Sequence, residues 1–361
     1  MGSKLSCPLS PPTFQVPASS STVDVRVIDT NTRLYLKPGV FWEPVLRGFD
    51  GPHAPVYCFL VSHGNRHILF DLGVRTDWES HAPKIVKLVK ATTVVTSGEK
   101  DVASLLDDDT SGLGIRSTDI EAIVWSHSDF DHVGDPSRFP ATTELVVGPG
   151  VKNRAWPGYP SNSDGTVLDS DAAGRNVREI NFEDTGLQVG GFKAFDYFGD
   201  GSFYLLDAPG HAPGHMCALA RTTADPPSFV FMGADACHHA GVLRPSQYLP
   251  LPQSVSSQSL ECYGGCPGKV LMQLAAWKSV DEPFFQVARG PLFWDHPTAM
   301  KTVAKMQKLD AAESLLIVLA HDNSLGGYLP LFPERVNDWK VQGVDEATRW
   351  AFCKELENVK T

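Results

Sequence analysis

Two imidazoles and two carboxylates lie within six positions of this chain, in His127-Ser128-Asp129-Phe130-Asp131-His132. The stretch follows the apolar run Ile123 to Trp125, which is typical of a buried strand, and Gly134 comes just after it. The four side chains are therefore expected on a turn at a strand end, where they can converge. Imidazole and carboxylate together are ligands of zinc, iron or manganese. The stretch predicts a metal site if further ligand residues lie elsewhere in the chain. Without them, it would be a polar loop with two incidental histidines.

Three later apolar runs also end in residues of these types. The run 203–207 leads into the segment 209–215, Pro-Gly-His-Ala-Pro-Gly-His, which contains His211. The run 228–232 is followed by Asp235, and the run 315–319 by His321. One such coincidence is weak evidence, but four strand ends are hard to explain as packing. Because chemistry-bearing residues gather on loops that a rigid scaffold positions, we expect these side chains to form one site.

The elements around these motifs alternate between strands and helices. Residues 56–61 and 67–71 are predicted to form a hairpin, because Gly64-Asn65 between them is a turn signal. Residues 83–91 and 297–309 have helical spacing of apolar residues. Two successive blocks of strands followed by helices predict a layered α/β sandwich with the site on the strand-end loops.

A single domain is expected over residues 23–361. Residues 1–22 are rich in Ser and Pro and have no periodicity, which predicts a disordered or loosely ordered N-terminus. Residues 241–296 hold many Pro, Gln, Ser and aromatic residues, with one helical run near 270–277. We expect that segment to form an insertion or lid over the site.

The composition of the 361 residues is that of a soluble globular protein, with 42% hydrophobic and 20% charged residues. The formal net charge of −11 argues against nucleic acid and anionic membranes as partners. No apolar run approaches the roughly 20 residues of a membrane span. The N-terminus lacks a signal-peptide core, and the seven scattered cysteines do not resemble a disulfide framework. These features predict a cytoplasmic location.

The order and spacing of the four motifs resemble those of the metallo-β-lactamase superfamily, which includes glyoxalase II and the N-acyl homoserine lactone lactonases. The family's H-x-H-x-D-H motif corresponds to residues 127–132, and its P-G-H-T-x-G-H motif to residues 209–215. Its Gly-Asp strand end corresponds to residues 233–235, and its final histidine to His321. The resemblance covers about residues 23 to 335, and it implies a four-layer αββα sandwich.

The resemblance also implies two divalent metal ions, with zinc expected first and manganese or iron as alternatives. The implied ligands are His127, Asp129 and His211 for the first ion, Asp131, His132 and His321 for the second, and Asp235 between them. His215 matches a family position outside the ligands. Asp71 matches the family's Asp-x-Gly at the end of an early strand, which supports the site indirectly.

Position 129 departs from the family, because most members have His where this chain has Asp129. A carboxylate still binds metal, but the additional negative charge reduces the net positive charge of a two-ion site. We therefore expect a less acidic bound water, together with a preference for harder metals or a weakly bound first ion.

The implied activity is the hydrolysis of a cyclic ester or amide, a lactone or lactam, by attack of a metal-bound hydroxide on a polarised carbonyl. Asp131 would also orient the hydroxide. His238 lies three residues after Asp235, at the place where homoserine lactone lactonases have a Tyr, and there it would donate a proton. An equally weighted alternative is that His238 is a surface residue of a loop.

The expected partner is a small molecule with a partly apolar or aromatic ring, because residues 41–42, 156–159 and 284–294 are rich in aromatic side chains. Similar fungal members open lactam rings of plant defence compounds, so a xenobiotic lactam is a specific candidate. Thioester hydrolysis is a second reading, although no basic patch for glutathione carboxylates is evident. An alternative that is not an enzyme is a metal-binding or sensing protein that has lost catalysis. The replacement of the usual His by Asp129 keeps this alternative open. Lactonase-like members are often dimers, so a homodimer is compatible with the resemblance.

Overall fold

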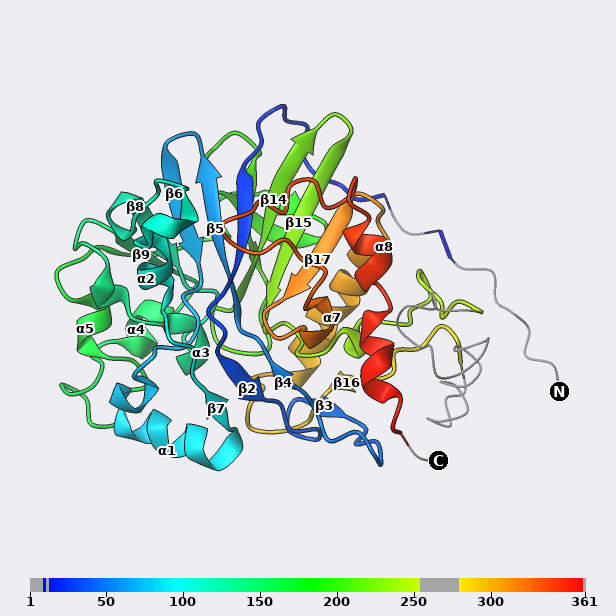
Figure 1. Ribbon diagram of the computed structural model, residues 1–361, viewed down its shortest axis with the longest axis horizontal. Helices are drawn as coiled ribbons and strands as arrows, with labels where there is room; N and C mark the ends of the chain where they lie inside the picture. The colour runs from blue at the N-terminus through cyan, green and yellow to red at the C-terminus, as the bar shows by residue number, and fades with distance from the viewer. Residues whose placement is uncertain (1–8, 11–12, 254–278, 360–361) are drawn as a thin grey trace.

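The fold consists of two six-stranded sheets packed face to face, with helices on the outside (Figure 1). It is seen in a computed structural model that describes residues 9–10, 13–253 and 279–359. The first sheet has the order β1-β5-β6-β8-β9-β10 and the second the order β11-β12-β13-β14-β15-β17. The strands of the first sheet are β1 (Asp24–Asp29), β5 (Tyr57–His63), β6 (Arg66–Phe70), β8 (Ile120–Val124), β9 (Glu144–Val147) and β10 (Val177–Glu179).

The second sheet begins with an antiparallel meander and ends with a crossover. Its strands are β11 (Gln188–Val189), β12 (Phe192–Asp196), β13 (Phe203–Asp207), β14 (Met216–Ala224), β15 (Pro227–Ala234) and β17 (Leu315–Leu319). Strands β15 and β17 are parallel, as are β6, β8, β9 and β10 in the first sheet. Parallel strands need crossover connections, and helices commonly supply them. Here α7 (His296–Asp310) connects β15 to β17.

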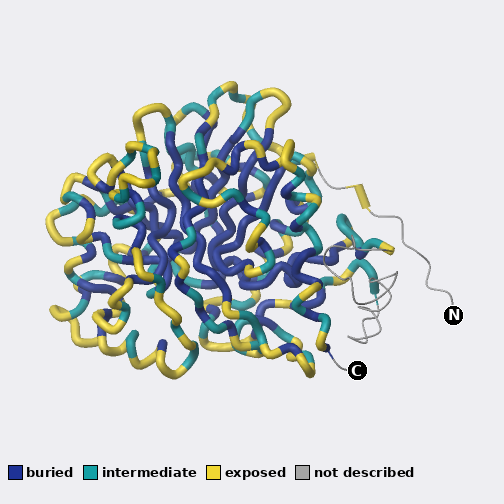
Figure 2. Tube along the Cα trace, in the orientation of Figure 1, coloured by how far each residue is buried: buried dark blue, intermediate teal, exposed yellow. Residues whose placement is uncertain are grey.

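The main core lies between the two sheets, where side chains from β5, β6 and β8 meet side chains from β13, β14 and β15. Two further clusters lie on the outer faces, under the helices and loops. Because the inner strands are covered on both faces, β8, β15 and β17 are almost continuously buried. Figure 2 shows the same distribution, with buried residues along the strands and exposed residues at the loops. This arrangement confirms the predicted layered α/β sandwich.

Smaller elements surround the sheets. The remaining strands are β2 (Arg33–Tyr35), β3 (Trp42–Glu43), β4 (His53–Ala54), β7 (Val95–Thr96) and β16 (Gln286–Val287). The remaining α-helices are α1 (Pro83–Thr92), α2 (Val102–Leu106), α3 (Phe130–Val133), α4 (Val151–Ala155), α5 (Asp169–Ala172) and α8 (Val344–Thr348). Among the described residues, none of these helices has the length and apolar character needed to cross a bilayer.

The helices predicted at residues 83–91 and 297–309 and the predicted hairpin are present. Helix α7 begins where expected, because Asp295 accepts a hydrogen bond from the backbone N–H of Thr298 and Pro297 occupies the first turn. Strands β5 and β6 pair antiparallel across the predicted turn, where Gly64 has a φ of 58°. Glycine adopts this left-handed conformation without steric cost, which explains the turn signal.

The prediction of a loosely ordered N-terminus is wrong for residues 13–22, which lie against the second sheet. The Phe14 ring packs edge-on against Phe229 at 5.1 Å. The carbonyl of Gln15 accepts a hydrogen bond from Gly190, and that of Pro17 accepts one from Arg221 at 2.7 Å. A segment without periodicity can still be fixed in this way, because an aromatic contact and hydrogen bonds to the body of the protein supply its partners.

The described parts of the expected insertion, 241–253 and 279–296, pack against the body of the protein. Strand β16 pairs antiparallel with β3, and Phe285 packs against Trp42 at 5.9 Å. Phe293 packs edge-on against two histidines of the site, His211 and His238. The predicted helical run near 270–277 lies outside the described residues. The lid therefore stays a prediction, although Phe293 does contact the site.

Candidate metal centre

Four loops bring six chemistry-bearing residues together at one end of the sandwich. His127 follows β8, and Asp131 and His132 belong to the short helix α3 in the same loop. His211 follows β13, Asp235 follows β15 and His321 follows β17. All six side chains are buried, so the structure places the predicted residues of four strand ends in a single cluster.

The cluster consists of two groups that share Asp235. One group contains Asp131, His132, Asp235 and His321, and the other contains His127, His211 and Asp235; in each, the potential ligand atoms all lie within 4.8 Å of one another. Oδ1 of Asp235 lies 3.1 Å from Nε2 of His132 and 3.2 Å from Nε2 of His321. Its Oδ2 lies 3.6 Å from Nε2 of His211 and 3.8 Å from Nε2 of His127. One carboxylate therefore faces both groups.

Asp129 occupies a different position from the other predicted ligands. Its side chain is 52% exposed, whereas that of His127 is fully buried. Its Oδ2 still lies 3.5 Å from Nε2 of His127 and 3.4 Å from Nε2 of His211. Asp129 thus stands at the solvent side of the His127 group without joining its buried cluster.

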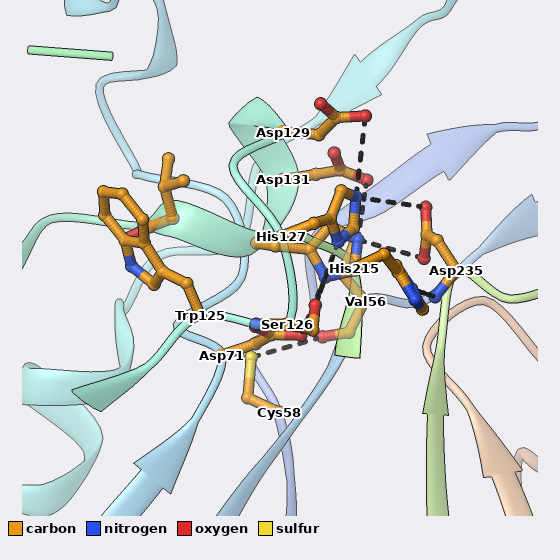
Figure 3. A network of polar contacts seen from close by, with 12 residues as sticks. Val56, Cys58, Asp71, Trp125, Ser126, His127, Asp129, Asp131, His215 and Asp235 are labelled. Carbon is orange, nitrogen blue, oxygen red and sulfur yellow. Dashed lines mark hydrogen bonds and ion pairs between the residues drawn. The ribbon is translucent and has the colours of Figure 1, made fainter. Parts of the chain in front are cut away.

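In His127, His132 and His321, the ring nitrogen Nδ1 is held by a hydrogen bond. Nδ1 of His127 lies 2.9 Å from Oγ of Ser126, beside Asp71 (Figure 3). Nδ1 of His132 donates to Oδ2 of Asp71 at 2.9 Å. Nδ1 of His321 donates to the backbone carbonyl of Pro55, also at 2.9 Å. These bonds fix the protons on Nδ1 and direct the Nε2 lone pairs of the rings into the cluster.

Several buried polar atoms inside the cluster have no hydrogen-bond partner among the described residues. They are Nε2 of His127, Nε2 of His132, both ring nitrogens of His211 and Oδ1 of Asp235. Buried polar groups without partners cost free energy, and native structures leave few of them. Converging imidazole nitrogens and carboxylate oxygens are the donor set of a transition-metal site, so the residues fit divalent metal ions.

The charges in the cluster also favour a cation. Burial alone would lower the pKa of His321, but the carboxylates of Asp235 and Asp131 outweigh burial and raise it to about 10. Burial would raise the pKa of Asp235, but His132, His321 and His238 hold it well below its usual range. The carboxylates therefore stabilise positive charge at this point, which protons or metal ions would supply in competition.

His238 and His215 lie beside the cluster. The His238 side chain is 1% exposed, its Nε2 lies 2.9 Å from Oδ2 of Asp235, and its ring packs between Phe41 and Phe293. It is therefore not a surface residue. Nδ1 of His215 donates to the carbonyl of Ala208, and its Nε2 accepts from the backbone N–H of Asp235. Both nitrogens of His215 are thus engaged outside the two groups.

A cavity of about 230 Å³ opens onto the cluster. Residues of both groups line it together with many apolar side chains. The complete lining is Leu34, Leu36, Phe41, Ile85, Leu88, Val89, Thr92, Thr93, Ser128, Asp129, Phe130, Asp131, Thr166, His211, Asp235, His238, Leu292 and His321.

Comparison with known proteins identifies the family. A family profile described as the metallo-beta-lactamase superfamily matches residues 51–220. The metallo-hydrolase mfmC of Annulohypoxylon moriforme is 61% identical over 99% of this chain and 93% of its own length. This chain belongs to the metallo-β-lactamase superfamily. As a member of the superfamily with a metallo-hydrolase relative of this similarity, it is a hydrolase.

Two further comparisons agree with this family. The gamma-lactamase FDB1 of Fusarium pseudograminearum (strain CS3096) is 43% identical over 96% of this chain and 85% of its own length. Among solved structures, an N-acyl homoserine lactone hydrolase with N-hexanoyl-L-homoserine at its catalytic metal center matches with a TM-score of 0.57. That match covers 87% of this chain and 99% of the other at 16% identity, and it shows that the two share the metallo-β-lactamase fold.

The sequence did not identify every residue that shapes this metallo-β-lactamase centre. The Ser126 hydroxyl was missed, although its position directly before His127 is a usable signal. The Pro55 carbonyl was missed as well, and a backbone oxygen 266 residues from His321 leaves no signal in the sequence.

Proposed function

We propose that this metallo-β-lactamase superfamily member opens a cyclic amide or cyclic ester, a lactam or lactone, with the help of two divalent metal ions. The observation that carries the proposal is the pair of ligand groups sharing Asp235 at the end of a cavity. The name of FDB1, gamma-lactamase, and its 43% identity to this chain support a cyclic amide as the substrate.

The proposed ligands follow the two groups. His127 and His211 would hold one ion together with Asp129, and the others would hold the second ion, with Asp235 between them. The second set is Asp131, His132 and His321. The histidine nitrogens favour zinc, while the three carboxylates leave manganese or iron as alternatives. When bound, these ions would polarise the substrate carbonyl and make water ionise near neutral pH.

Asp129 supports a more specific proposal about metal occupancy. Its Oδ2 faces His127 and His211, but the side chain is half exposed, whereas the proposed ligands of the other ion are all buried, so water competes with Asp129 for the first ion. We therefore propose that the His127 site binds its ion more weakly than the His132 site. Metal titration of the metal-free protein tests this proposal, and two equally tight zinc ions per chain would contradict it.

The protein side chains would position the substrate and the proton. Asp131 lies beside His321, 3.3 Å away, and lines the cavity, where its carboxylate can orient the attacking water. Burial lowers the pKa of His238 to about 4, so its ring is neutral near pH 7. The one proton of the neutral ring lies on Nε2, which faces Oδ2 of Asp235 at 2.9 Å. In the proposed step this N–H turns from Asp235 to the departing atom, where its hydrogen bond stabilises the charge that develops.

The leading test is hydrolysis of a panel by protein loaded with zinc or manganese. The panel contains γ-lactams, γ-lactones, an acyl homoserine lactone, a β-lactam and a thioester. Asp235→Asn removes the shared carboxylate charge, and Asp24→Asn changes a surface carboxylate paired with Arg335 and is the matched control. We expect ring opening that disappears only in Asp235→Asn. Turnover of the thioester alone, or of nothing with metals bound, would overturn the proposal.

His238 has its own test. We expect His238→Ala to lower kcat by about 10²-fold to 10³-fold with unchanged metal content, because one positioned donor contributes about that much. His238→Gln keeps an N–H donor and should retain more of the activity. Unchanged kcat/KM in His238→Ala would reject the role.

The thioester alternative has little support from the cavity. No Lys or Arg is among the described residues that line it. A thioester substrate with several carboxylates would therefore lack cationic partners at this site.

A further inference from the structure

The cavity has a lining of two chemically different kinds. Histidines and carboxylates of the proposed metal centre form one part of it. Another part is a set of aliphatic side chains that we call the apolar chamber, which consists of Leu34, Leu36, Ile85, Leu88 and Val89. Nothing in the proposed ring-opening step uses this chamber, since the scissile carbonyl must lie at the metal centre.

One wall of the chamber is the amphipathic helix α1. Ile85, Leu88 and Val89 are spaced so that they share one face, and all three line the cavity. A surface helix usually buries such a stripe against the core. Here Val89 is the only buried residue of the helix, and Leu88 remains 47% exposed. In Figure 1, α1 lies at the lower edge of the molecule, away from both sheets. The apolar face of α1 therefore bounds a cavity, where a ligand could cover it.

A second part of the chamber is formed by β2 and the residue that follows it. Leu34 and Leu36 point the same way because side chains alternate along a strand, and they belong to the buried cluster under the second sheet. Pairing of β2 with β4 and β7 fixes this wall. The hydroxyl of Thr93 donates to the carbonyl of Tyr35 at 2.8 Å, which ties the end of α1 to β2. The two walls thus have a defined separation.

The chamber offers an anionic group no favourable partner. No described lining residue is Lys or Arg, and the basic residues Lys84, Lys87 and Lys90 of α1 are absent from the lining. The carboxylate of Asp129 also lines the cavity, at the solvent side of the metal cluster. Placing a carboxylate in the chamber would cost desolvation without an opposite charge in return.

We infer that the substrate is a neutral ring that carries an aliphatic substituent, which packs in the apolar chamber between α1 and β2 while the ring carbonyl faces the histidines. This inference rests on the proposed ring-opening function for the orientation of the ring. It narrows the substrate from any lactam or lactone to one with a hydrocarbon group next to the ring.

The test measures binding separately from catalysis. The probes are 2-alkylcyclopentanones with substituents from methyl to hexyl, which have a ring and a carbonyl but no scissile ester or amide bond. Their Kd values for the metal-loaded protein are measured by calorimetry. We expect the Kd to fall about fourfold for each added methylene until the chamber is filled, which is the gain for burying one such group. A probe whose alkyl substituent ends in a carboxylate should not gain this affinity from added methylenes.

Two variants of α1 form a matched pair. Leu88→Gln changes a chamber residue, and Val86→Gln makes a similar change on the side of the helix that borders a separate surface hollow with Lys87 and Lys90. Both positions are at least partly exposed, so both variants should fold. We expect Leu88→Gln to weaken binding of the longest probe about fivefold to tenfold and to leave the methyl probe unchanged. Val86→Gln should bind the whole series like the original protein.

The outcomes separate the inference from the function on which it rests. A Kd that does not change with chain length, or equal losses in both α1 variants, would overturn the apolar chamber even if the protein opens unsubstituted rings. A steep dependence on chain length that only Leu88→Gln reduces would support the chamber. In that case, failure to open the corresponding 5-alkyl lactones and lactams would count against ring opening alone.

Discussion

Oδ2 of Asp71 accepts a hydrogen bond from Nδ1 of His132 at 2.9 Å and another from Oγ of Ser126 at 2.7 Å. Because the Ser126 hydroxyl has one proton and donates it to Asp71, its oxygen accepts from Nδ1 of His127, 2.9 Å away. A single carboxylate therefore sets the proton position on one histidine of each ligand group. Asp71 itself has a φ of 61°, a left-handed conformation that Asp tolerates better than most residues.

The first prediction concerns this carboxylate. Asp71→Asn replaces an oxygen acceptor by an amide that can present N–H to His132, so the ring loses its fixed orientation. We expect metal affinity to fall about 10-fold to 100-fold, as for other partners that hold metal-binding histidines. Titration of the metal-free protein with zinc measures the change.

Its control is Asp24→Asn, which removes a carboxylate from an exposed ion pair with Arg335 and should leave metal affinity unchanged. Ser126→Ala provides a finer comparison. It removes the acceptor of His127 while His132 keeps its bond to Asp71, so the weaker binding should be confined to one of the two ions. Two ions bound by Asp71→Asn as tightly as by the original protein would contradict the role.

The second prediction concerns strain next to Asp235. Ala234 is the last residue of β15 and has a φ of 42°, in a region that residues with a Cβ atom seldom occupy. Ala234→Gly should relieve this strain and raise the free energy of unfolding of the metal-free protein by about 0.5–1 kcal/mol. The more flexible backbone should hold Asp235 less firmly, so metal affinity should fall.

Asn31 is a control position for Ala234, because it also has a positive φ but lies outside the metal centre. Asn31 has a φ of 60° in the loop between β1 and β2, so Asn31→Gly changes backbone freedom without touching the ligand groups. Denaturant unfolding and zinc titration of both variants make the comparison. If Ala234→Gly kept full metal affinity, the strained residue would have no positioning role.

Much of the site could be predicted because its residues are local in sequence. His127, Asp131 and His132 follow one apolar strand within a few positions, and the other ligand-type residues each follow their own strand. Strand ends are readable from runs of apolar residues, and the order of the motifs carries the family resemblance. The layered fold is predictable for the same reason, because its strands are long and buried.

What could not be predicted depends on tertiary structure. The half-exposed position of Asp129 is decided by its surroundings, since the motif shows only that a carboxylate is present. The carbonyl of Pro55 meets His321 across 266 residues. The packing of residues 13–22 was missed because an irregular segment has no period. Its partners Arg221 and Phe229 belong to the second sheet, and Gly190 lies in the turn between β11 and β12.

The third prediction concerns a buried ion pair behind the loop that carries His238. Nε and Nη2 of Arg244 donate to the two carboxylate oxygens of Asp310, at 2.7 and 2.5 Å, and Nη1 donates to the carbonyl of Arg349. Both side chains are buried. Asp310→Ala should lower the free energy of unfolding by about 3–5 kcal/mol, because it leaves a buried guanidinium without its counter-charge.

Removing both charges tests the cause of that loss. The double variant Arg244→Met with Asp310→Leu replaces the pair by apolar side chains, and it should recover most of the stability. Denaturant unfolding of the single and double variants measures the difference. A double variant as unstable as Asp310→Ala would show that the loss came from packing rather than from the unpaired charge.

The last prediction is a pH dependence of stability that arises at Asp171, in helix α5. Its side chain is buried, Oδ2 accepts the backbone N–H of Leu168 at 2.8 Å, and Oδ1 has no hydrogen-bond partner among the described residues. Burial raises its pKa to about 7, while Leu168 and Arg75 oppose the shift. The protonated form is thus favoured in the folded protein.

The sign of the effect follows from this raised pKa. The contribution of Asp171 to stability is fully present below its unfolded pKa near 4 and is lost as the pH rises through 7, at up to about 1.4 kcal/mol per pH unit. Asp171→Asn removes the titration. Relative to the original protein, this variant should therefore become more stable between pH 4.5 and pH 8, as measured by denaturant unfolding at each pH.

Asp169 in the same helix provides the opposite control. Hydrogen bonds from Ser161 and Gly158 lower its pKa, so its contribution is present above the unfolded pKa and is lost as the pH falls. Asp169→Asn should therefore differ from the original protein most at neutral pH, as a destabilisation, and least in acid. If the stability difference for Asp171→Asn were constant from pH 4.5 to pH 8, then Asp171 would not titrate in this range and the assignment of a buried, protonated carboxyl would be wrong.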